Sequence, residues 1–201
     1  MTNPIWHEPT MSRSDRWSLH NLYGMTVWLT GLSGSGKSTI AHEAARQLHH
    51  AGILTYVLDA DNIRLGLNSD LGFGDADRVE NIRRMAEVAR LCSDAGLVTF
   101  VPIISPYSTS RAHARKIHAD DDGLAFIEVH VATPLAECER RDSKGLYAKA
   151  RSGQMTGMTG LDAPYEVPQL PDVVLSAHGE SLESSTKTLI DAISARSNLK
   201  H

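Results

Sequence analysis

The chain has 201 residues, of which 41% are hydrophobic and 22% charged, and its net charge is −4. The length suits one domain with a substantial core, and the acidic balance excludes a global basic field that would favour nucleic acid or an anionic membrane. Cys92 and Cys138 fit neither a zinc pattern nor a disulfide framework, which favours reduced thiols. No apolar run approaches transmembrane length and no secretory leader is recognisable, so we expect a free-standing cytoplasmic protein.

Residues 1–24 are predicted to form an N-terminal extension of the main domain, which spans residues 25–201. The extension contains Trp6, Trp17, Leu19 and Tyr23 and is too apolar for a simple disordered tail. We expect it to pack on the domain or on a second subunit.

The main domain alternates predicted strands with predicted helices. Strands are expected at residues 26–30, 54–59, 98–104, 125–131 and 172–175, and the clearest helices at 77–95 and 182–193. Asp77 and Glu80 resemble a capping box at the start of the longer helix, and Gly96 ends it. The strands are mostly continuous apolar runs, which is typical of a parallel sheet covered on both faces. Ligands of such sheets bind beyond the carboxyl ends of the strands, where Asp59, Asp61 and Ser105 are expected.

The first strand is followed by a sequence that matches the phosphate-binding pattern G-x-x-x-x-G-K-[ST] at every fixed position. It reads Gly31-Leu32-Ser33-Gly34-Ser35-Gly36-Lys37-Ser38, and a helical pattern follows it. Glycines let backbone N–H groups approach phosphate oxygens, and the positive end of the following helix points at the same group. Lys37 can reach the β- and γ-phosphates, and the Ser38 hydroxyl can bind Mg²⁺. The sequence therefore predicts ATP and Mg²⁺ as cofactors, the alternative being a Gly/Ser-rich turn that matches by chance.

The second strand is followed by a cluster of polar groups that comprises Asp59, Asp61, Asn62 and Arg64. One carboxylate can orient hydrated Mg²⁺, and the other can accept a proton from an attacking hydroxyl. The alternative is an Asp/Asn-rich turn, which is common after strands. Beside a phosphate loop, the catalytic interpretation is the better one.

These motifs, together with several later ones, resemble the adenylylsulfate kinase family. The stretches that carry the resemblance are residues 31–39, 59–68, 71–73, 77–84, 104–107, 138–151, 159–160 and 165–166, in the order and spacing of the family. The resemblance implies the stand-alone bacterial type of this family and a nucleotide-kinase-like P-loop NTPase fold. That fold is a three-layer α/β sandwich with a central, mainly parallel five-stranded sheet and a mobile lid at about residues 140–168. It also implies phosphorylation of the 3′-hydroxyl of adenosine 5′-phosphosulfate (APS) by ATP, which yields 3′-phospho-APS (PAPS) and ADP in sulfate assimilation.

The resemblance also implies roles for individual residues. ATP would be bound by Gly31, Leu32, Ser33, Gly34, Ser35, Gly36, Lys37, Ser38, Thr39 and Arg140, the last by stacking on adenine. The catalytic group would comprise Lys37, Asp61, Asp59 and Ser105, with Mg²⁺ on Ser38 and Asp59. APS would be bound by Asp59, Asp61, Asn62, Arg64, Phe73, Arg78, Asn81, Ile104, Ser105, Lys144, Met158 and Thr159.

The chemistry of these side chains suits an anionic nucleotide. Guanidinium groups and an amide, on Arg64, Arg78 and Asn81, suit a phosphosulfate, and Phe73 can stack on a base. The alternatives are a solvated charge for Arg78 and a loop anchor for Phe73. The basic run at residues 140–151 could be a solvated helix face, but a lid that excludes water explains it better.

Some family members have been assigned a phosphoserine at the position of Ser105. No adjacent His or Lys in the sequence would activate that serine, so we predict direct in-line transfer of the phosphoryl group. The choice between Asp59 and Asp61 as proton acceptor stays open at this point.

Two residues depart from the family pattern. Ala60 stands where the family usually has glycine, and Met158 where it usually has a phenylalanine that sandwiches the substrate adenine. Alanine requires a negative φ at that position, and methionine gives up ring stacking while keeping an apolar contact. A kinase for another small nucleotide is therefore the main alternative, followed by a nucleotide-binding module without catalysis. A nucleic-acid kinase is opposed by the acidic charge. The resemblance further implies a homodimer and a functional link to ATP sulfurylase, with no nucleic-acid or membrane partner.

Overall fold

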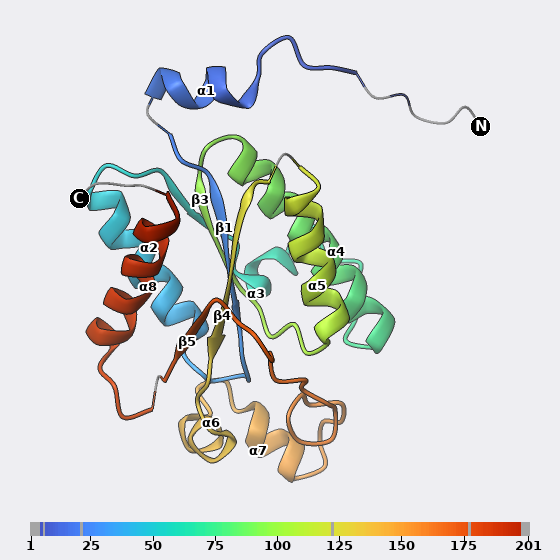
Figure 1. Ribbon diagram of the computed structural model, residues 1–201. Helices are drawn as coiled ribbons and strands as arrows, with labels where there is room; N and C mark the ends of the chain where they lie inside the picture. Colours follow the sequence, from blue (N-terminus) through green and yellow to red (C-terminus); the bar gives the residue numbers. More distant parts are fainter. Residues whose placement is uncertain (1–4, 6, 21, 122, 177, 198–201) are drawn as a thin grey trace.

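A computed structural model of the protein describes residues 5, 7–20, 22–121, 123–176 and 178–197 (Figure 1). Trp6 of the N-terminal extension lies outside these residues. The elements in chain order are α1 (Arg13–His20), β1 (Met25–Thr30), α2 (Lys37–His50), β2 (Thr55–Val57), α3 (Ala60–Ile63), α4 (Asp75–Asp94), β3 (Val98–Pro102), α5 (Ser108–Ala119), β4 (Ala125–Val131), α6 (Leu135–Arg141), α7 (Leu146–Arg151), β5 (Val173–Leu175) and α8 (Leu182–Ser197).

The strands form one sheet of five, in the order β2-β3-β1-β4-β5, and every pairing in it is parallel. This confirms the predicted α/β fold with a central parallel sheet and all five predicted strands, although β2 and β3 are shorter than expected. The central strand β1 is buried along its whole length. Because β1 lies between β3 and β4, the loop that follows it opens in the middle of the sheet's carboxyl edge.

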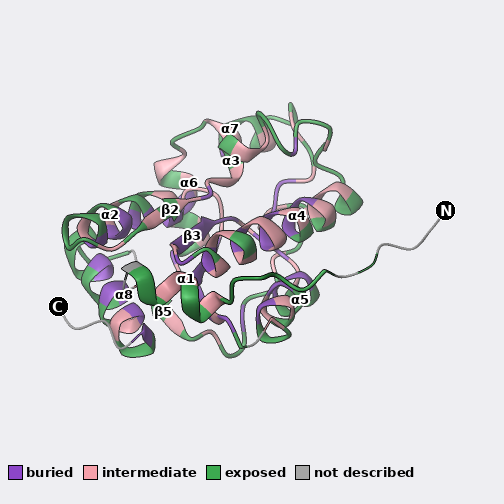
Figure 2. Ribbon diagram, turned by 90° about the horizontal axis from the view of Figure 1, so that it is seen from above, coloured by how far each residue is buried: buried purple, intermediate pink, exposed green. Residues whose placement is uncertain are grey.

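Helices cover both faces of the sheet, which gives three layers (Figures 1 and 2). The side chains of β1 alternate between the two faces, as the period of a strand requires. Val27 and Leu29 join the core under α2 and α8. Trp28 joins the core under α4 and α5, where Met85 and Phe126 are also fully or almost fully buried. Helices α6 and α7 lie beyond the carboxyl ends of the strands (Figure 1).

Helix α4 begins earlier than the sequence predicts. It starts at Asp75, with Gly74 as an N-cap that makes no side-chain cap bond, so the predicted capping box at Asp77 and Glu80 is wrong. Glu80 instead pairs with Arg83 and Arg84 on the helix surface. Residues three and four positions apart lie side by side on a helix, so both guanidinium groups can reach the Glu80 carboxylate. They bind it in place of the backbone N–H of a capping box.

Helix α1 is held at the amino-terminal edge of the sheet, opposite α6 and α7 (Figure 1). Arg13 Nε lies 2.8 Å from Asp94 Oδ1, and Trp17 Nε1 donates to the carbonyl of Asp94 at 2.9 Å. A second bond joins Arg13 Nη2 to Asp121 Oδ1 at 2.8 Å. These contacts tie the described part of the extension to the end of α4. Within the described residues, no helix is both long and apolar enough to cross a bilayer.

Candidate active site

The loop between β1 and α2 has the backbone geometry of a phosphate-binding loop. Gly31 has φ of 151°, and a Cβ at this position would lie 2.6 Å from the carbonyl oxygen of Val131, so no other residue fits there. Gly36 has φ of 104° and forms the N-cap of α2 without any side-chain cap bond. The first N–H groups of α2 are therefore open to an external anion.

Lys37 is folded back over this loop. Its Nζ donates to the carbonyl of Leu32 at 2.6 Å, and the side chain is almost completely buried. Burial disfavours the ammonium form and lowers the pKa of Lys37 to about 8. An arriving phosphate would supply the opposite charge that this buried group lacks.

Ser38 and Asp59 bring the two sequence motifs together. The Ser38 hydroxyl donates to Asp59 Oδ2 at 2.8 Å, while Asp59 Oδ1 accepts the N–H of Asp61 at 2.9 Å and caps α3. A hydroxyl and a carboxylate oxygen are hard ligands of the kind Mg²⁺ prefers, so this pair fits the predicted cation. Ala60 is the first residue of α3 and has no positive φ, so the backbone accepts alanine here.

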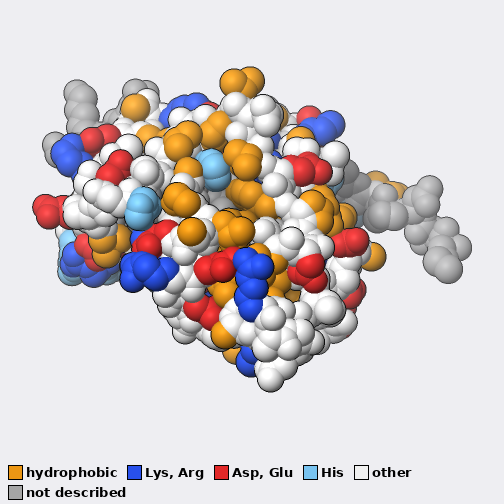
Figure 3. Space-filling model, turned by 90° about the horizontal axis from the view of Figure 1, so that it is seen from below, with side chains coloured by type: hydrophobic (Ala, Val, Ile, Leu, Met, Phe, Trp, Pro, Cys, Tyr) orange, Lys and Arg blue, Asp and Glu red, His pale blue; other side chains and the backbone are white. Residues whose placement is uncertain are grey.

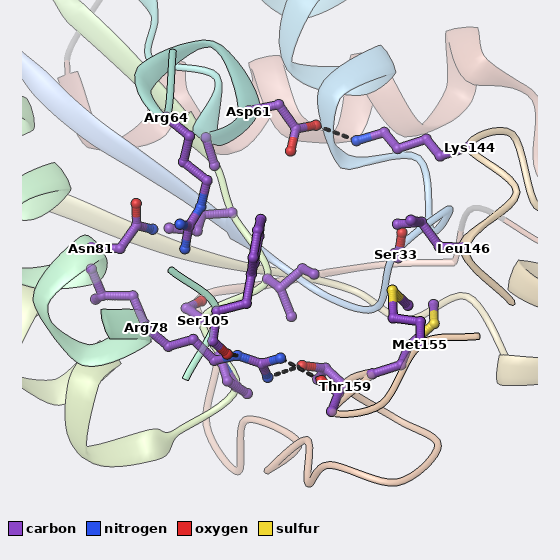
Figure 4. A pocket seen from close by; sticks show the side chains of 18 of the residues that line it. Ser33, Asp61, Arg64, Arg78, Asn81, Ser105, Lys144, Leu146, Met155 and Thr159 are labelled. Carbon is purple, nitrogen blue, oxygen red and sulfur yellow. Dashed lines mark hydrogen bonds and ion pairs between the residues drawn. The ribbon is translucent and has the colours of Figure 1, made fainter. Parts of the chain in front are cut away.

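A cavity of about 550 Å³ lies beside the phosphate loop and extends to the predicted lid at residues 140–168 (Figure 4). Its volume falls within the range of small-molecule sites, about 300–1,000 Å³. The residues predicted to bind the substrate that line it are Asp61, Arg64, Phe73, Arg78, Asn81, Ile104, Ser105, Lys144, Met158 and Thr159. Asp59 and Asn62 are not among its lining residues. Ser33 of the phosphate loop is, so the loop and the cavity share a wall.

The cationic side chains of the cavity already have protein partners. Lys144 pairs with Asp61 across the cavity (Figure 4). Arg78 donates to Thr159 Oγ1 at 2.7 Å and to the carbonyl of Gly157, both in the segment predicted to form the lid. Arg64 donates to the carbonyl of Gly72 at 2.8 Å. Most of these acceptors are neutral carbonyls or hydroxyls, which an anionic ligand would outcompete.

Asn81 and Phe73, two further predicted substrate-binding residues, also line the cavity. Asn68 Nδ2 donates to Asn81 Oδ1 at 2.9 Å, so the amide oxygen of Asn81 is occupied and its amino group is left for a ligand. Phe73 is 72% exposed, which excludes the alternative of a core anchor. The Arg64 guanidinium lies 4.4 Å from the centroid of the Phe73 ring.

Ser105 lies in the loop between β3 and α5, in a backbone conformation that is rare for a serine. Its φ is 42°, and the residue is buried. The Oγ accepts a hydrogen bond from Trp28 Nε1 at 3.1 Å, and an indole N–H cannot take up a proton. The Ser105 carbonyl accepts from Arg111 Nη1 at 2.8 Å, which holds the turn.

Met158 and Arg140 occupy different environments. Met158 is 5% exposed and packs in a small cluster with Cys138 and Tyr147, although it also reaches the cavity. Arg140 stands on the surface of α6 and pairs with Glu137, its Nε 2.7 Å from Oε2. It does not line the cavity, and the prediction that it stacks on the adenine of ATP stays a prediction.

The apolar walls of the cavity were missed by sequence reasoning. Ile82, Ile103, Leu146 and Met155 line it beside the predicted polar groups. Each lies one to three positions from a predicted substrate-binding residue. This proximity in sequence is the only feature that could have identified them as lining the cavity. Figure 3 shows the face beyond the carboxyl ends of the strands, where apolar side chains gather in the centre with basic and acidic groups beside them.

Comparisons with known proteins agree with this geometry. Residues 23–176 match the adenylylsulphate kinase family. The adenylyl-sulfate kinase of Citrobacter koseri is 53% identical over 180 residues, which cover 90% of this chain and 87% of that protein. A Mycobacterium tuberculosis bifunctional enzyme, CysN/CysC, is 49% identical over 97% of this chain and 31% of its own length. The structure of the M. tuberculosis APS kinase CysC in complex with AMPPNP and APS has a TM-score of 0.83 at 53% identity, covering 86% of this chain and 98% of that one. The chain therefore belongs to the adenylylsulphate kinase family.

Proposed function

We propose that the protein transfers the γ-phosphoryl group of ATP to the 3′-hydroxyl of APS, giving PAPS and ADP. One observation carries the proposal beyond family membership: Ser33 belongs both to the phosphate loop and to the wall of the cavity that holds the cationic groups. An ATP bound on the loop would present its terminal phosphate at that shared wall. Transfer between two bound nucleotides depends mainly on such positioning and on neutralisation of charge.

The phosphate side of the reaction is assigned to Lys37, Ser38 and Asp59. Lys37 would bind the β- and γ-phosphates, and Ser38 and Asp59 would hold Mg²⁺ directly or through water. When bound, Mg²⁺ would neutralise charge on the phosphate oxygens. The hydrogen bond between Ser38 and Asp59 supports a shared role for these two groups.

Asp61 is the better candidate for the proton acceptor. Asp59 is engaged by the Ser38 hydroxyl and by a backbone N–H, whereas Asp61 lines the cavity and its side chain is 66% exposed. Its partner is Lys144, a flexible cation that a phosphosulfate can attract away. Asp61 would then accept the hydroxyl proton as the P–O bond forms.

The substrate side is assigned to Arg64, Arg78, Asn81 and Lys144 for the anion and to Phe73 and Met158 for the base. Transfer is direct in this proposal. The indole donor on Ser105 Oγ supports that choice, because no base stands at that bond to activate the serine.

Further assignments concern the domain organisation, the assembly and the source of the substrate. Residues 1–24 form an extension of the kinase domain at 25–201, and about 140–168 act as a lid that closes over both nucleotides. The protein works as a homodimer in the cytoplasm with Mg²⁺. APS must come from an ATP sulfurylase, and the bifunctional relative is consistent with such a link between activities.

The test is direct detection of PAPS by chromatography after incubation of the purified protein with ATP, Mg²⁺ and APS. Formation of PAPS should require all three and should fall by roughly 10²–10³-fold in Asp61→Asn, with little change in the KM for ATP. Tight ATP binding without PAPS would refute APS as substrate. Rapid phosphorylation of another nucleotide would then indicate that the methionine at position 158 accompanies a different substrate specificity.

A further inference from the structure

Four consecutive carbonyl groups of the phosphate loop are each bound by a side chain of the protein. Lys37 Nζ donates to the Leu32 carbonyl at 2.6 Å, and the Tyr147 hydroxyl donates to the Ser33 carbonyl at 2.9 Å. Arg141 Nη1 donates to the Gly34 carbonyl at 3.5 Å, and Thr133 Oγ1 donates to the Ser35 carbonyl at 2.8 Å. Only the first donor belongs to the phosphate-loop motif. The other three come from the segment that runs from the end of β4 into α7, about a hundred residues further along the chain.

The direction of these carbonyls decides the direction of the N–H groups that bind phosphate. In a planar trans peptide the C=O of one residue and the N–H of the next point opposite ways. A donor that holds the Ser33 carbonyl outward therefore turns the N–H of Gly34 inward. A donor on the Ser35 carbonyl does the same for the N–H of Gly36.

We propose that Tyr147 and Thr133 are positioning residues that set the phosphate loop for the β- and γ-phosphates of ATP. The proposal rests on the proposed kinase function but adds residues that neither the phosphate-loop motif nor the substrate cavity contains. Neither side chain is assigned a contact with a reacting atom. Each acts through a loop carbonyl.

The surroundings of Tyr147 favour its hydrogen bond to the Ser33 carbonyl. The side chain is 3% exposed, and burial raises the pKa of its hydroxyl, which keeps the group a hydrogen-bond donor. Its backbone N–H is fixed by Asp142 Oδ1 at 3.0 Å. The neighbouring Leu146 lines the substrate cavity. One short helix, α7, thus forms a wall of the cavity and supports the phosphate loop at the same time.

Thr133 supplies support that does not depend on the lid. It is 4% exposed and stands between the end of β4 and the start of α6, outside residues 140–168. Its hydroxyl reaches the Ser35 carbonyl from the sheet side of the loop. Loss of the Tyr147 bond and loss of the Thr133 bond should therefore have the same effect on nucleotide binding, although only one donor can move with the lid.

The experiment uses Tyr147→Phe and Thr133→Val, which remove the donor and keep most of the side-chain volume. Tyr56→Phe is the matched control, because Tyr56 is 53% exposed on the edge strand β2. Affinity for ADP with Mg²⁺ is measured by calorimetry, and the KM values for ATP and APS are measured from PAPS formation. Melting temperatures are recorded for every variant.

Each donor variant should bind ADP about tenfold more weakly and raise the KM for ATP by a similar factor, since a loop carbonyl loses its hydrogen-bond partner. The KM for APS should stay within twofold, and Tyr56→Phe should match the wild type. ADP affinity within twofold of the wild type in a folded variant would overturn the proposal. A parallel rise in the KM for APS would also overturn it, because that would indicate a displaced lid.

The outcomes separate this proposal from the proposed function. If Tyr147→Phe does not fold, Thr133→Val decides the question by the same criteria. If the wild-type protein makes no PAPS, the kinase function fails, yet the calorimetric loss of ADP affinity would still support the role of these two side chains.

Discussion

The phosphate loop and the substrate cavity meet at Ser33, but they are built in opposite ways. In the proposed function the loop binds phosphate through backbone N–H groups, while its carbonyls are held by side chains and its lysine is buried. The cavity depends on long side chains of three cations, each of which is paired with a protein group that a ligand can replace. On the proposed function, the site for the phosphate donor would thus be preformed, whereas recognition of the acceptor would be completed by exchange of partners.

The largest effect is expected for a substitution in the phosphate loop. Lys37→Ala should lower the rate of PAPS formation by about 10³-fold, because the loop loses its only side-chain cation aimed at the β- and γ-phosphates. The fold should survive, since a buried cation is removed and not an apolar contact. Lys187→Ala, on the exposed surface of α8, is the control for loss of a lysine. Near-full activity of Lys37→Ala would contradict the proposed role of the phosphate loop and its buried lysine in the reaction.

The second largest effect is expected in the substrate cavity, where a ligand can replace the protein partners of the cations. Arg78→Ala should raise the KM for APS by roughly 10- to 100-fold, as expected for loss of charge-assisted hydrogen bonds, while the KM for ATP changes less than about twofold. Arg83→Ala on the same helix is the matched control, because its guanidinium pairs with Glu80 on the surface of α4. Steady-state kinetics with each substrate varied in turn measure the split. An equal rise in both KM values would mean that Arg78 stabilises the whole lid and does not recognise APS.

The buried lysine also predicts how nucleotide affinity depends on pH. With a pKa of about 8, Lys37 is mostly protonated at pH 7 and mostly neutral at pH 9 in the free protein. Phosphate binds the ammonium form, so affinity for ADP should fall about tenfold between these pH values as the cation is lost. Calorimetry across this range gives the profile, and Lys37→Ala should show a flat one. A flat wild-type profile would show that Lys37 keeps its charge in the loop.

The smallest effect concerns the base. Met158→Phe should lower the KM for APS by up to about fivefold through ring stacking. Because Met158 is packed against Cys138 and Tyr147, the larger ring should cost about 1–3 kcal/mol and lower the melting temperature by several degrees. Met155→Phe, in the same cavity, is the control for an added ring. An unchanged KM for APS in Met158→Phe would remove Met158 from base recognition.

The sequence by itself determined the parts that depend on local pattern. The motif at residues 31–38 required a strand before it and a helix from Lys37 after it, and both are present. Five apolar runs gave the five strands, and the alternation with helices gave parallel pairing. The cationic and amide groups of the cavity were also identified in advance, because they stand in motifs that the family resemblance reaches.

Tertiary structure decided what links residues far apart in the chain. No local pattern connects Tyr147 to the Ser33 carbonyl, or Asn68 to Asn81, and the apolar walls at Leu146 and Met155 look like any other helix or loop residue in the sequence. The start of α4 was misjudged for the same reason, since the partners of Glu80 depend on side chains that a capping pattern ignores. Glycines permit the backbone conformation of the phosphate loop, whereas the hydrogen bonds that hold it and the cavity beside it exist only once the chain is packed.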